Sequence, residues 1–344
     1  MKSYYYSIAA AAIFISGQAF AFTAGNNSPL VAAPVSTRKE WNTGVEIELP
    51  DFETLFDRVQ TASPLAKHVM EGNSGGFNEC GSDTLKWKKL ESSSRKTVHQ
   101  IDKLDSYQNV KTPLLRFRSS IKGPLIGERF SHFIMDLDER KKWDTACAKN
   151  HEVYPIDDLD AVNAIFGDEE KYGTCTRAGV GYTQTKQSVI SPREQLIIGG
   201  MQEFKNGATM LWGTEMEEQH NYLLPEGQRH TRAKSHLFAA TLAPTSDGFD
   251  IEYLLQMDVG GGVPHFLTTP ALVDAIKKLF DHTKRYFEGG EGSELDLHLK
   301  SLQRGADLEV VRDIDDSFTV KMDFSKEASH LHDDASLLPL FFTP

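Results

Sequence analysis

Two groups of residues in this chain have the types and spacing that acid–base catalysis or metal binding requires. His230, Arg232, Lys234 and His236 alternate along a predicted strand, so their side chains share one face, and a buried histidine there could transfer protons. Residues 330–334, His-Leu-His-Asp-Asp, offer metal-ligand types, but they stand in an acidic tail without a partner cluster. Because such alternating charges are more often a solvated strand face, we predict no catalytic residue, no metal site and no cofactor.

The glycines and cysteines agree with that prediction. Residues 260–262 are three glycines that lead to Pro264, and the Lys-Ser/Thr pair of a phosphate-binding loop does not follow them. We therefore predict a turn between a strand and a helix. Cys80, Cys147 and Cys175 are widely spaced and odd in number, which excludes a disulfide framework and a CxxC metal site.

The composition excludes several classes of protein. The chain has 344 residues, of which 40% are hydrophobic, so it is not a disordered chain. Its net charge of −12 repels nucleic acid, which we exclude as a partner. The acidity is uneven, because residues 291–344 carry 12 acidic and 5 basic side chains. We treat this stretch as an acidic C-terminal extension, with strand-like segments at 308–314 and 317–323 that either pack on the domain or bind a protein partner.

The composition of the first 45 residues predicts a targeting leader. Residues 1–21 combine Lys2, an apolar run at 8–16 and Ala-Phe-Ala before a cleavage point, which is the layout of a signal peptide rather than of a membrane anchor. Residues 22–45 begin with Phe22 and are poor in acids, like a transit peptide, or form a linker. This pattern resembles the two-part leader of algal complex plastids and predicts a plastid protein; the alternatives are a secreted protein or one of the endoplasmic reticulum lumen.

The remaining chain has the element order of an α+β protein. The patterns predict a helix over 51–70 with a break at Pro64, a second over 124–135, and a last one over 269–287 with Thr269 as its cap. Strands are predicted at 86–90, 97–101, 114–119, 179–186, 195–202, 208–215, 229–242 and 249–259. We expect a curved antiparallel sheet around the last helix, with an apolar pocket between them.

Three stretches resemble START domains, the lipid-transfer domains related to the steroidogenic acute regulatory protein. They are residues 136–144, which end in Trp143-Asp144, residues 191–194 with Pro-Arg, and residues 251–270 with an apolar strand, Asp258, three glycines and a proline. Their order and spacing agree with the family over residues 51–288. The resemblance implies a helix-grip fold, START/Bet v 1-like, which encloses an apolar tunnel for one lipid. It also implies lipid binding or transfer, with transient membrane contact, rather than catalysis.

The resemblance and the residue alternation together select the candidate site. Alternation places one face of the strand 251–257 and one face of the last helix toward the ligand. The predicted lining residues are Tyr253, Leu255, Met257, Leu272, Ile276, Leu279 and Phe280. The family pattern places Val189 and Ile190 at the tunnel mouth and makes Trp143, Asp144, Arg193 and Asp258 a structural signature.

One position departs from the family pattern. Cholesterol-binding members carry a basic partner of a buried acid six residues beyond the Pro-Arg arginine, and here Gly199 stands there. A glycerolipid, fatty acid, pigment or isoprenoid is therefore as well supported as a sterol. The alternative function is an enzyme, such as a cyclase, hydrolase or isomerase, that uses a helix-grip cavity.

Overall fold

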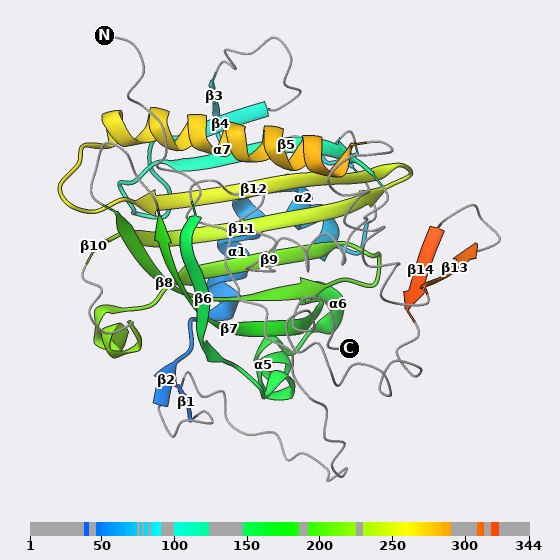
Figure 1. Ribbon diagram of the computed structural model, residues 1–344, viewed down its shortest axis with the longest axis horizontal. Helices are drawn as coiled ribbons and strands as arrows, with labels where there is room; N and C mark the ends of the chain where they lie inside the picture. The colour runs from blue at the N-terminus through cyan, green and yellow to red at the C-terminus, as the bar shows by residue number, and fades with distance from the viewer. Residues whose placement is uncertain are drawn as a thin grey trace, which may run out of the picture.

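The computed structural model describes residues 38–40, 46–73, 76–77, 79–81, 84–90, 100–123, 147–185, 192–224, 230–289, 308–312 and 318–322. Its helices are α1 (Phe52–Ala62), α2 (Pro64–Met70), α5 (Leu159–Phe166), α6 (Glu169–Tyr172), the 3-10 helix η2 (Glu218–Leu223) and α7 (His265–Phe287). A large sheet forms the middle of the molecule, with α7 on its near side and α1 and α2 behind it (Figure 1).

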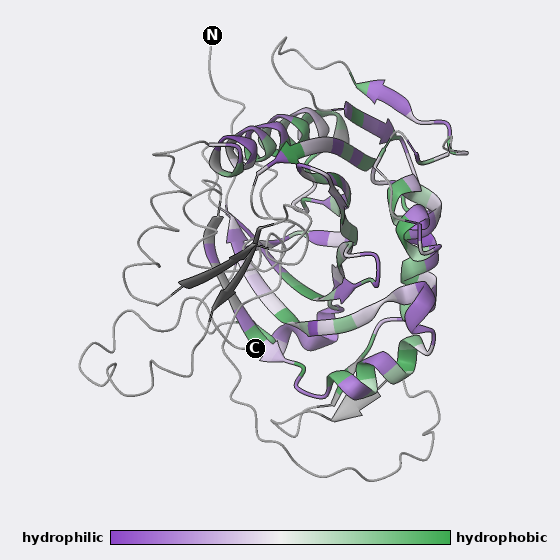
Figure 2. Cartoon of the chain, turned by 90° about the vertical axis from the view of Figure 1, so that its right-hand side faces the viewer, coloured by the Kyte–Doolittle hydropathy of each residue, from purple (hydrophilic) through white to green (hydrophobic). Residues whose placement is uncertain are grey.

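The central sheet has ten strands, in the order β3-β4-β5-β12-β11-β9-β8-β7-β6 with β10 beside β8. Their bounds are β3 Lys88–Leu90, β4 Gln100–Leu104, β5 Leu114–Lys122, β6 Cys147–Pro155, β7 Thr174–Thr185, β8 Arg193–Glu203, β9 Thr209–Glu215, β10 Thr231–Arg232, β11 Lys234–Thr245 and β12 Gly248–Asp258. All neighbours along the main path are antiparallel, and only β10 pairs in parallel. Viewed from the side, the sheet is strongly curved (Figure 2). The predicted α+β helix-grip architecture is confirmed.

Two further pairs of short strands lie outside this sheet. β1 (Arg38–Glu40) pairs with β2 (Glu46–Glu48), and β13 (Leu308–Arg312) pairs with β14 (Phe318–Met322). The second pair confirms the strand-like segments that the sequence predicts in the acidic extension.

The predicted break of the first helix at Pro64 is confirmed. Ser63 ends α1, and its hydroxyl oxygen accepts a hydrogen bond from the Ala66 amide, so the same residue caps α2. Asp51 caps α1 by accepting from the Thr54 amide at 3.1 Å. A proline at the first position of α2 costs no hydrogen bond, because that amide has no partner within the helix.

The last helix begins earlier than predicted. Thr269 was expected as its cap, but α7 starts at His265 after Pro264, and Pro270 lies inside the helix. The amide of Thr268 already donates to the Pro264 carbonyl at 3.3 Å. Pro270 lies close to the start of α7. The helix therefore tolerates the loss of the one hydrogen bond that the missing N–H of Pro270 would have donated.

The sequence interpretation missed β1, β2 and η2, and it also missed three elements in or beside the central sheet. β6 adds an edge strand to the sheet, and α5 and α6 lie where only a loop was expected. Both helices carry a standard signal: Asp158 and Asp168 cap them, and Gly167 and Gly173 follow their last residues with positive φ. The helix predicted over 124–135 lies outside the described residues.

Two apolar cores lie on opposite faces of the sheet. The first, which we call the α7 core, joins α7 to the alternate residues of β12 from Phe249 to Met257. The second, the outer core, joins α1, α2, α5 and α6 to the other face, and it contains Leu254, the one apolar residue that breaks the β12 alternation. The two-residue period of β12 therefore predicts its faces correctly.

Candidate functional site

The α7 core contains every residue that was predicted to line the ligand site. Tyr253, Leu255 and Met257 are at most 3% exposed. They belong to the same cluster as Leu272, Ile276, Leu279 and Phe280. Strand and helix periodicity thus bring the predicted residues together on the facing surfaces of β12 and α7.

Aromatic rings form the centre of this core. The ring of Tyr253 packs edge-on against Phe238, Phe117 and Phe280, with centroids 5.4, 6.0 and 6.1 Å away. Phe117 and Phe280 also stack on each other at 6.3 Å. These contacts connect β5, β11 and β12 to the middle of α7 and give the core a large apolar surface.

Two of the predicted signature residues, Arg193 of β8 and Asp258 of β12, form hydrogen bonds with the turn between β12 and α7. Arg193 is buried, and its Nε donates to the Val259 carbonyl at 2.7 Å, while burial lowers the pKa of its guanidinium. Asp258 accepts from the Gly260 amide at 2.8 Å. A Cβ on Gly260, where φ is 67°, would lie 2.1 Å from the Arg232 carbonyl oxygen, so this strand-to-helix turn requires glycine. Residues 260–262 form a turn, as predicted.

Trp143, Asp144, Val189 and Ile190 lie outside the described residues. The His330–Asp334 segment and the leader, residues 1–21, lie outside them as well.

The charged strand on which the enzyme alternative depends does not join the α7 core. His236 Nδ1 pairs with Glu215 Oε1 at 2.8 Å, and Lys234 Nζ pairs with Glu218 at 3.3 Å. The register of β11 against β12 shifts between Ser235 and Leu237, so the strict alternation assumed for these side chains is interrupted at His236.

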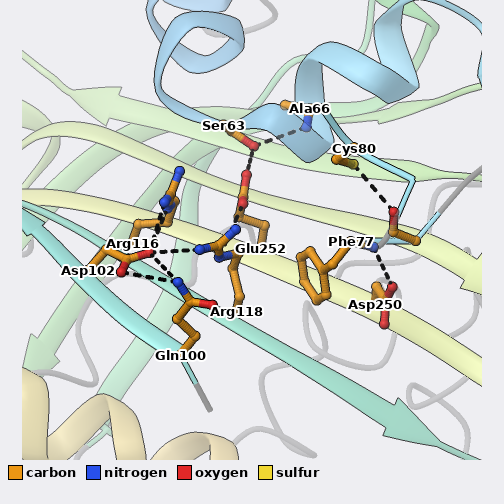
Figure 3. Close-up of polar contacts among 11 residues, drawn as sticks. Ser63, Ala66, Phe77, Cys80, Gln100, Asp102, Arg116, Arg118, Asp250 and Glu252 are labelled. Carbon is orange, nitrogen blue, oxygen red and sulfur yellow. Dashed lines mark hydrogen bonds and ion pairs between the residues drawn. The ribbon is translucent and has the colours of Figure 1, made fainter. Parts of the chain in front are cut away.

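The sequence interpretation missed a buried polar network on the outer face (Figure 3). Asp102 accepts from Arg116 at 2.8 Å and from Arg118 at 2.9 Å, and Arg118 lies 3.9 Å from Glu252. Ser63, at the α1–α2 break, donates its hydroxyl to Glu252. Burial raises the pKa of Glu252. The network fastens α2 to β4, β5 and β12.

The same face also holds Phe77 against the sheet. The Phe77 amide donates to Asp250 Oδ2 at 2.9 Å, and Ser120 donates to the other oxygen of that carboxylate (Figure 3). The Cys80 thiol donates to the Gly76 carbonyl at 3.4 Å, and burial raises its pKa to about 11. Burial also raises the pKa of the Cys175 thiol to about 12, so neither thiol ionises readily at neutral pH.

One half-buried carboxyl, that of Glu152, stands apart from this network. Glu152 on β6 pairs in register with Gly181, and its Oε1 would lie 2.6 Å from a Cβ on Gly179. Both glycines alternate with Ala178 and Val180 of the outer core, so Glu152 lies on the α7 side of the sheet. Burial raises the pKa of Glu152 to about 7, although Arg177 opposes the shift.

A surface hollow of about 250 Å³ lies elsewhere, between α5, α6 and β7. It is lined by Asn163, Phe166, Gly167, Glu169, Gly173 and Thr174. Asn163 already bonds through both side-chain atoms to the backbone of Cys175, at 2.7 and 3.1 Å. The hollow is small and part of the outer face, so it is not the predicted site.

The described residues contain neither a membrane-spanning helix nor a metal-binding cluster. No helix among them is long and apolar enough to cross a membrane. Within the same residues, no three His, Cys, Asp or Glu side chains are grouped as a metal ion would require.

Comparison with known proteins returns START-domain structures, as the sequence resemblance predicted. No protein-family model and no curated protein matches the chain. Human STARD10 superposes with a TM-score of 0.47 and 15% identity, over 66% of this chain and 81% of its own. Human StAR-related lipid transfer protein 5 superposes with a TM-score of 0.46 and 15% identity, over 69% of this chain and 98% of its own.

A bacterial structure gives a similar result. The STAR-related lipid transfer protein from Xanthomonas axonopodis superposes with a TM-score of 0.43 and 14% identity, over 59% of this chain and 98% of its own. At these scores, the helix-grip assignment rests on the chain's own strand order and on the position of α7.

Proposed function

We propose that this protein binds one hydrophobic lipid between β12 and α7 and carries it between membranes, without catalysis. The observation that carries the proposal is the α7 core, an apolar surface separate from the outer core. The charged network of Asp102, Arg116 and Glu252 lies on the outer face and leaves the facing surfaces of β12 and α7 to apolar contacts. The sequence resemblance to START domains supports the same function.

Apolar contact alone is strong enough for such binding. Each Å² of apolar surface removed from water contributes about 25 cal/mol, so about 400 Å² contributes about 10 kcal/mol. That gain exceeds the lower estimates of the cost of fixing a ligand, which begin at about 4 kcal/mol. No covalent chemistry is needed.

We propose that the start of α7 touches the membrane. Phe266 and Leu267 are 75% and 45% exposed, and the neighbouring Val263 packs against the α7 core. An exposed apolar pair continuous with the ligand face suits insertion among lipid headgroups. The net charge of −12 does not favour adhesion to anionic lipids, so apolar contact is the expected attraction.

Lipid extraction from the purified protein, followed by mass analysis, tests the proposed function. We expect one lipid per chain in the native protein. Ala240 belongs to the α7 core and the adjacent Ala239 to the outer core, which provides a matched pair of variants. Ala240→Leu should reduce the bound lipid, whereas Ala239→Leu should retain it. Absence of lipid from the native protein, even after incubation with lipid vesicles, would overturn the proposal.

We also propose that the leader directs the protein into a plastid through the secretory pathway. The support is the signal-like segment 1–21 followed by Phe22 and an acid-poor stretch. A fluorescent protein fused behind residues 1–45 should reach the plastid of an alga with a complex plastid. Phe22→Ala should leave it in the secretory pathway. Secretion of the unaltered fusion would contradict the proposal.

A further inference from the structure

Among the described residues, the buried polar atoms without a hydrogen-bond partner include two on the α7 face. They are Oε1 of Gln195 on β8 and Oγ of Ser235 on β11, in residues that are 1% and 0% exposed. A polar atom that loses water and gains no partner destabilises the folded protein. Such atoms are uncommon in folded proteins and call for an explanation.

Both residues lie beside Met257 of the α7 core. Ser235 is the direct cross-strand partner of Met257, so their side chains point to the same face. Gln195 places Nε2 2.8 Å from the Met257 sulfur. A thioether can accept a hydrogen bond but cannot donate one, which assigns the amide nitrogen to the sulfur and leaves Oε1 as the free atom. The two unpartnered oxygens therefore belong to one place on the α7 face.

A glutamine on the opposite face shows how the chain treats buried amides that only support the fold. Gln256 of β12 donates to the Tyr107 and Thr112 carbonyls at 3.2 and 2.9 Å. Its Oε1 accepts from Arg58 at 3.1 Å. That amide is fully used, whereas the acceptor of Gln195 is not.

We propose that Gln195 and Ser235 bind the polar group of the lipid, and that this group is an uncharged hydrogen-bond donor such as a hydroxyl or an amide N–H. The inference rests on the proposed function and names the ligand class. Gln195 Oε1 can only accept, so it selects a donor, while the Ser235 hydroxyl can donate to the oxygen of the same group. A carboxylate or phosphate diester offers acceptors alone and would leave Oε1 unpaired.

The arrangement also orients the ligand. Met257 stands near the end of β12 that leads to the exposed start of α7, and the apolar residues continue from there to Phe249 at the other end. This run of nine residues is about 26 Å long at the rise of an antiparallel strand. The polar group should therefore lie near the α7 start, with the hydrocarbon along β12.

Native mass spectrometry with two competing probes tests this assignment. The purified protein is incubated with an equimolar mixture of 1-hexadecanol and its methyl ether, and the two complexes are counted. The ether keeps the acceptor oxygen and lacks the donor. We expect the alcohol to be favoured about two- to tenfold, the usual worth of one neutral hydrogen bond.

Two variants separate the two contacts. Gln195→Met keeps the side-chain length and removes the acceptor, so the preference for the alcohol should vanish while the ether still binds. Ser235→Ala removes a donor that both probes can use, so both should bind about two- to tenfold more weakly with the preference kept. Both variants should melt at or above the native temperature, because each removes an unpartnered polar group.

Thr241→Val is the matched control. Its hydroxyl is also buried and without a partner, on the same strand as Ser235, but it pairs in register with Glu252 on the outer face. This variant should leave both affinities unchanged. Equal binding of alcohol and ether to the native protein, or an unchanged preference in Gln195→Met, would overturn the inference and leave the proposed function standing. Failure of both probes to bind would overturn both.

Discussion

The two faces of the sheet differ in how their buried side chains are paired. On the outer face, Asp102 and Arg116 are buried and paired with each other, and Gln256 connects the sheet to Arg58 of α1 and to the Tyr107 loop. On the α7 face, the surfaces of β12 and α7 are aromatic and aliphatic, and the amide oxygen of Gln195 on β8 is left unpaired. The outer face therefore holds the fold together, while the α7 face is suited to a partner that the chain itself does not provide.

The largest expected effect comes from breaking the outer network. Asp102→Asn leaves the buried guanidinium of Arg116 without its carboxylate, and it should lower the free energy of unfolding by about 3–5 kcal/mol. The exposed Asp105 pairs with Lys88 and Lys103, so Asp105→Asn should cost below about 1 kcal/mol. Urea unfolding measures both. Equal costs would show that the outer face does not hold the fold in this way.

The half-buried carboxyl on β6 should make stability depend on pH. Partial burial raises the pKa of Glu152 from 4.5 to about 7. Between these two pH values, the folded protein keeps a proton that the unfolded chain releases. Stability should fall as pH rises from about 4.5 to 7, by up to about 3 kcal/mol, and level off above that. Glu152→Gln should lack this component. Urea midpoints at pH 5 and pH 8 test it, and identical pH dependence of both proteins would contradict it.

Enlarging one alanine on each face compares the two cores directly. Ala239 pairs in register with Trp212 and Leu254, so Ala239→Leu should cost about 1–3 kcal/mol through overpacking. Ala240→Leu, toward the ligand side, should cost less stability and remove more bound lipid. Thermal unfolding and lipid content of the two variants measure the contrast. A larger stability loss for Ala240→Leu would mean that the α7 face is ordinary packed core.

The smallest effect on stability is expected at the start of α7. Phe266→Ser with Leu267→Ser should leave the free energy of unfolding within about 0.5 kcal/mol, as for most exposed positions. It should slow lipid transfer between neutral vesicles without weakening the binding of lipid in solution. Tyr222→Ser is the control, because Tyr222 is also exposed but lies on η2. Equal transfer rates in all three proteins would exclude α7 as the membrane contact.

Periodicity predicted which apolar residues of β12 and α7 pack together, and it predicted the outer face poorly. A strand of period two and a helix of period 3.6 determine which residues meet, so the apolar partners of Tyr253 and Phe280 followed from sequence. Charged residues that alternate with apolar ones along a strand predict a face in contact with solvent. Arg116, Arg118 and Glu252 follow this pattern, but pairing between strands that are distant in sequence buries them instead. A polar residue in a long apolar strand, such as Gln195, carries no local sign of whether its partner is protein or ligand.

Photo-crosslinking tests the central claim most directly, because it reports where the lipid lies. A hexadecanol with a diazirine in its chain would be bound to the purified protein, irradiated and located by peptide mass spectrometry. The account predicts adducts on the α7-facing residues of β12, 251–257, and on 272–280 of α7. Adducts confined to α1, α2 or other parts of the outer face would contradict it.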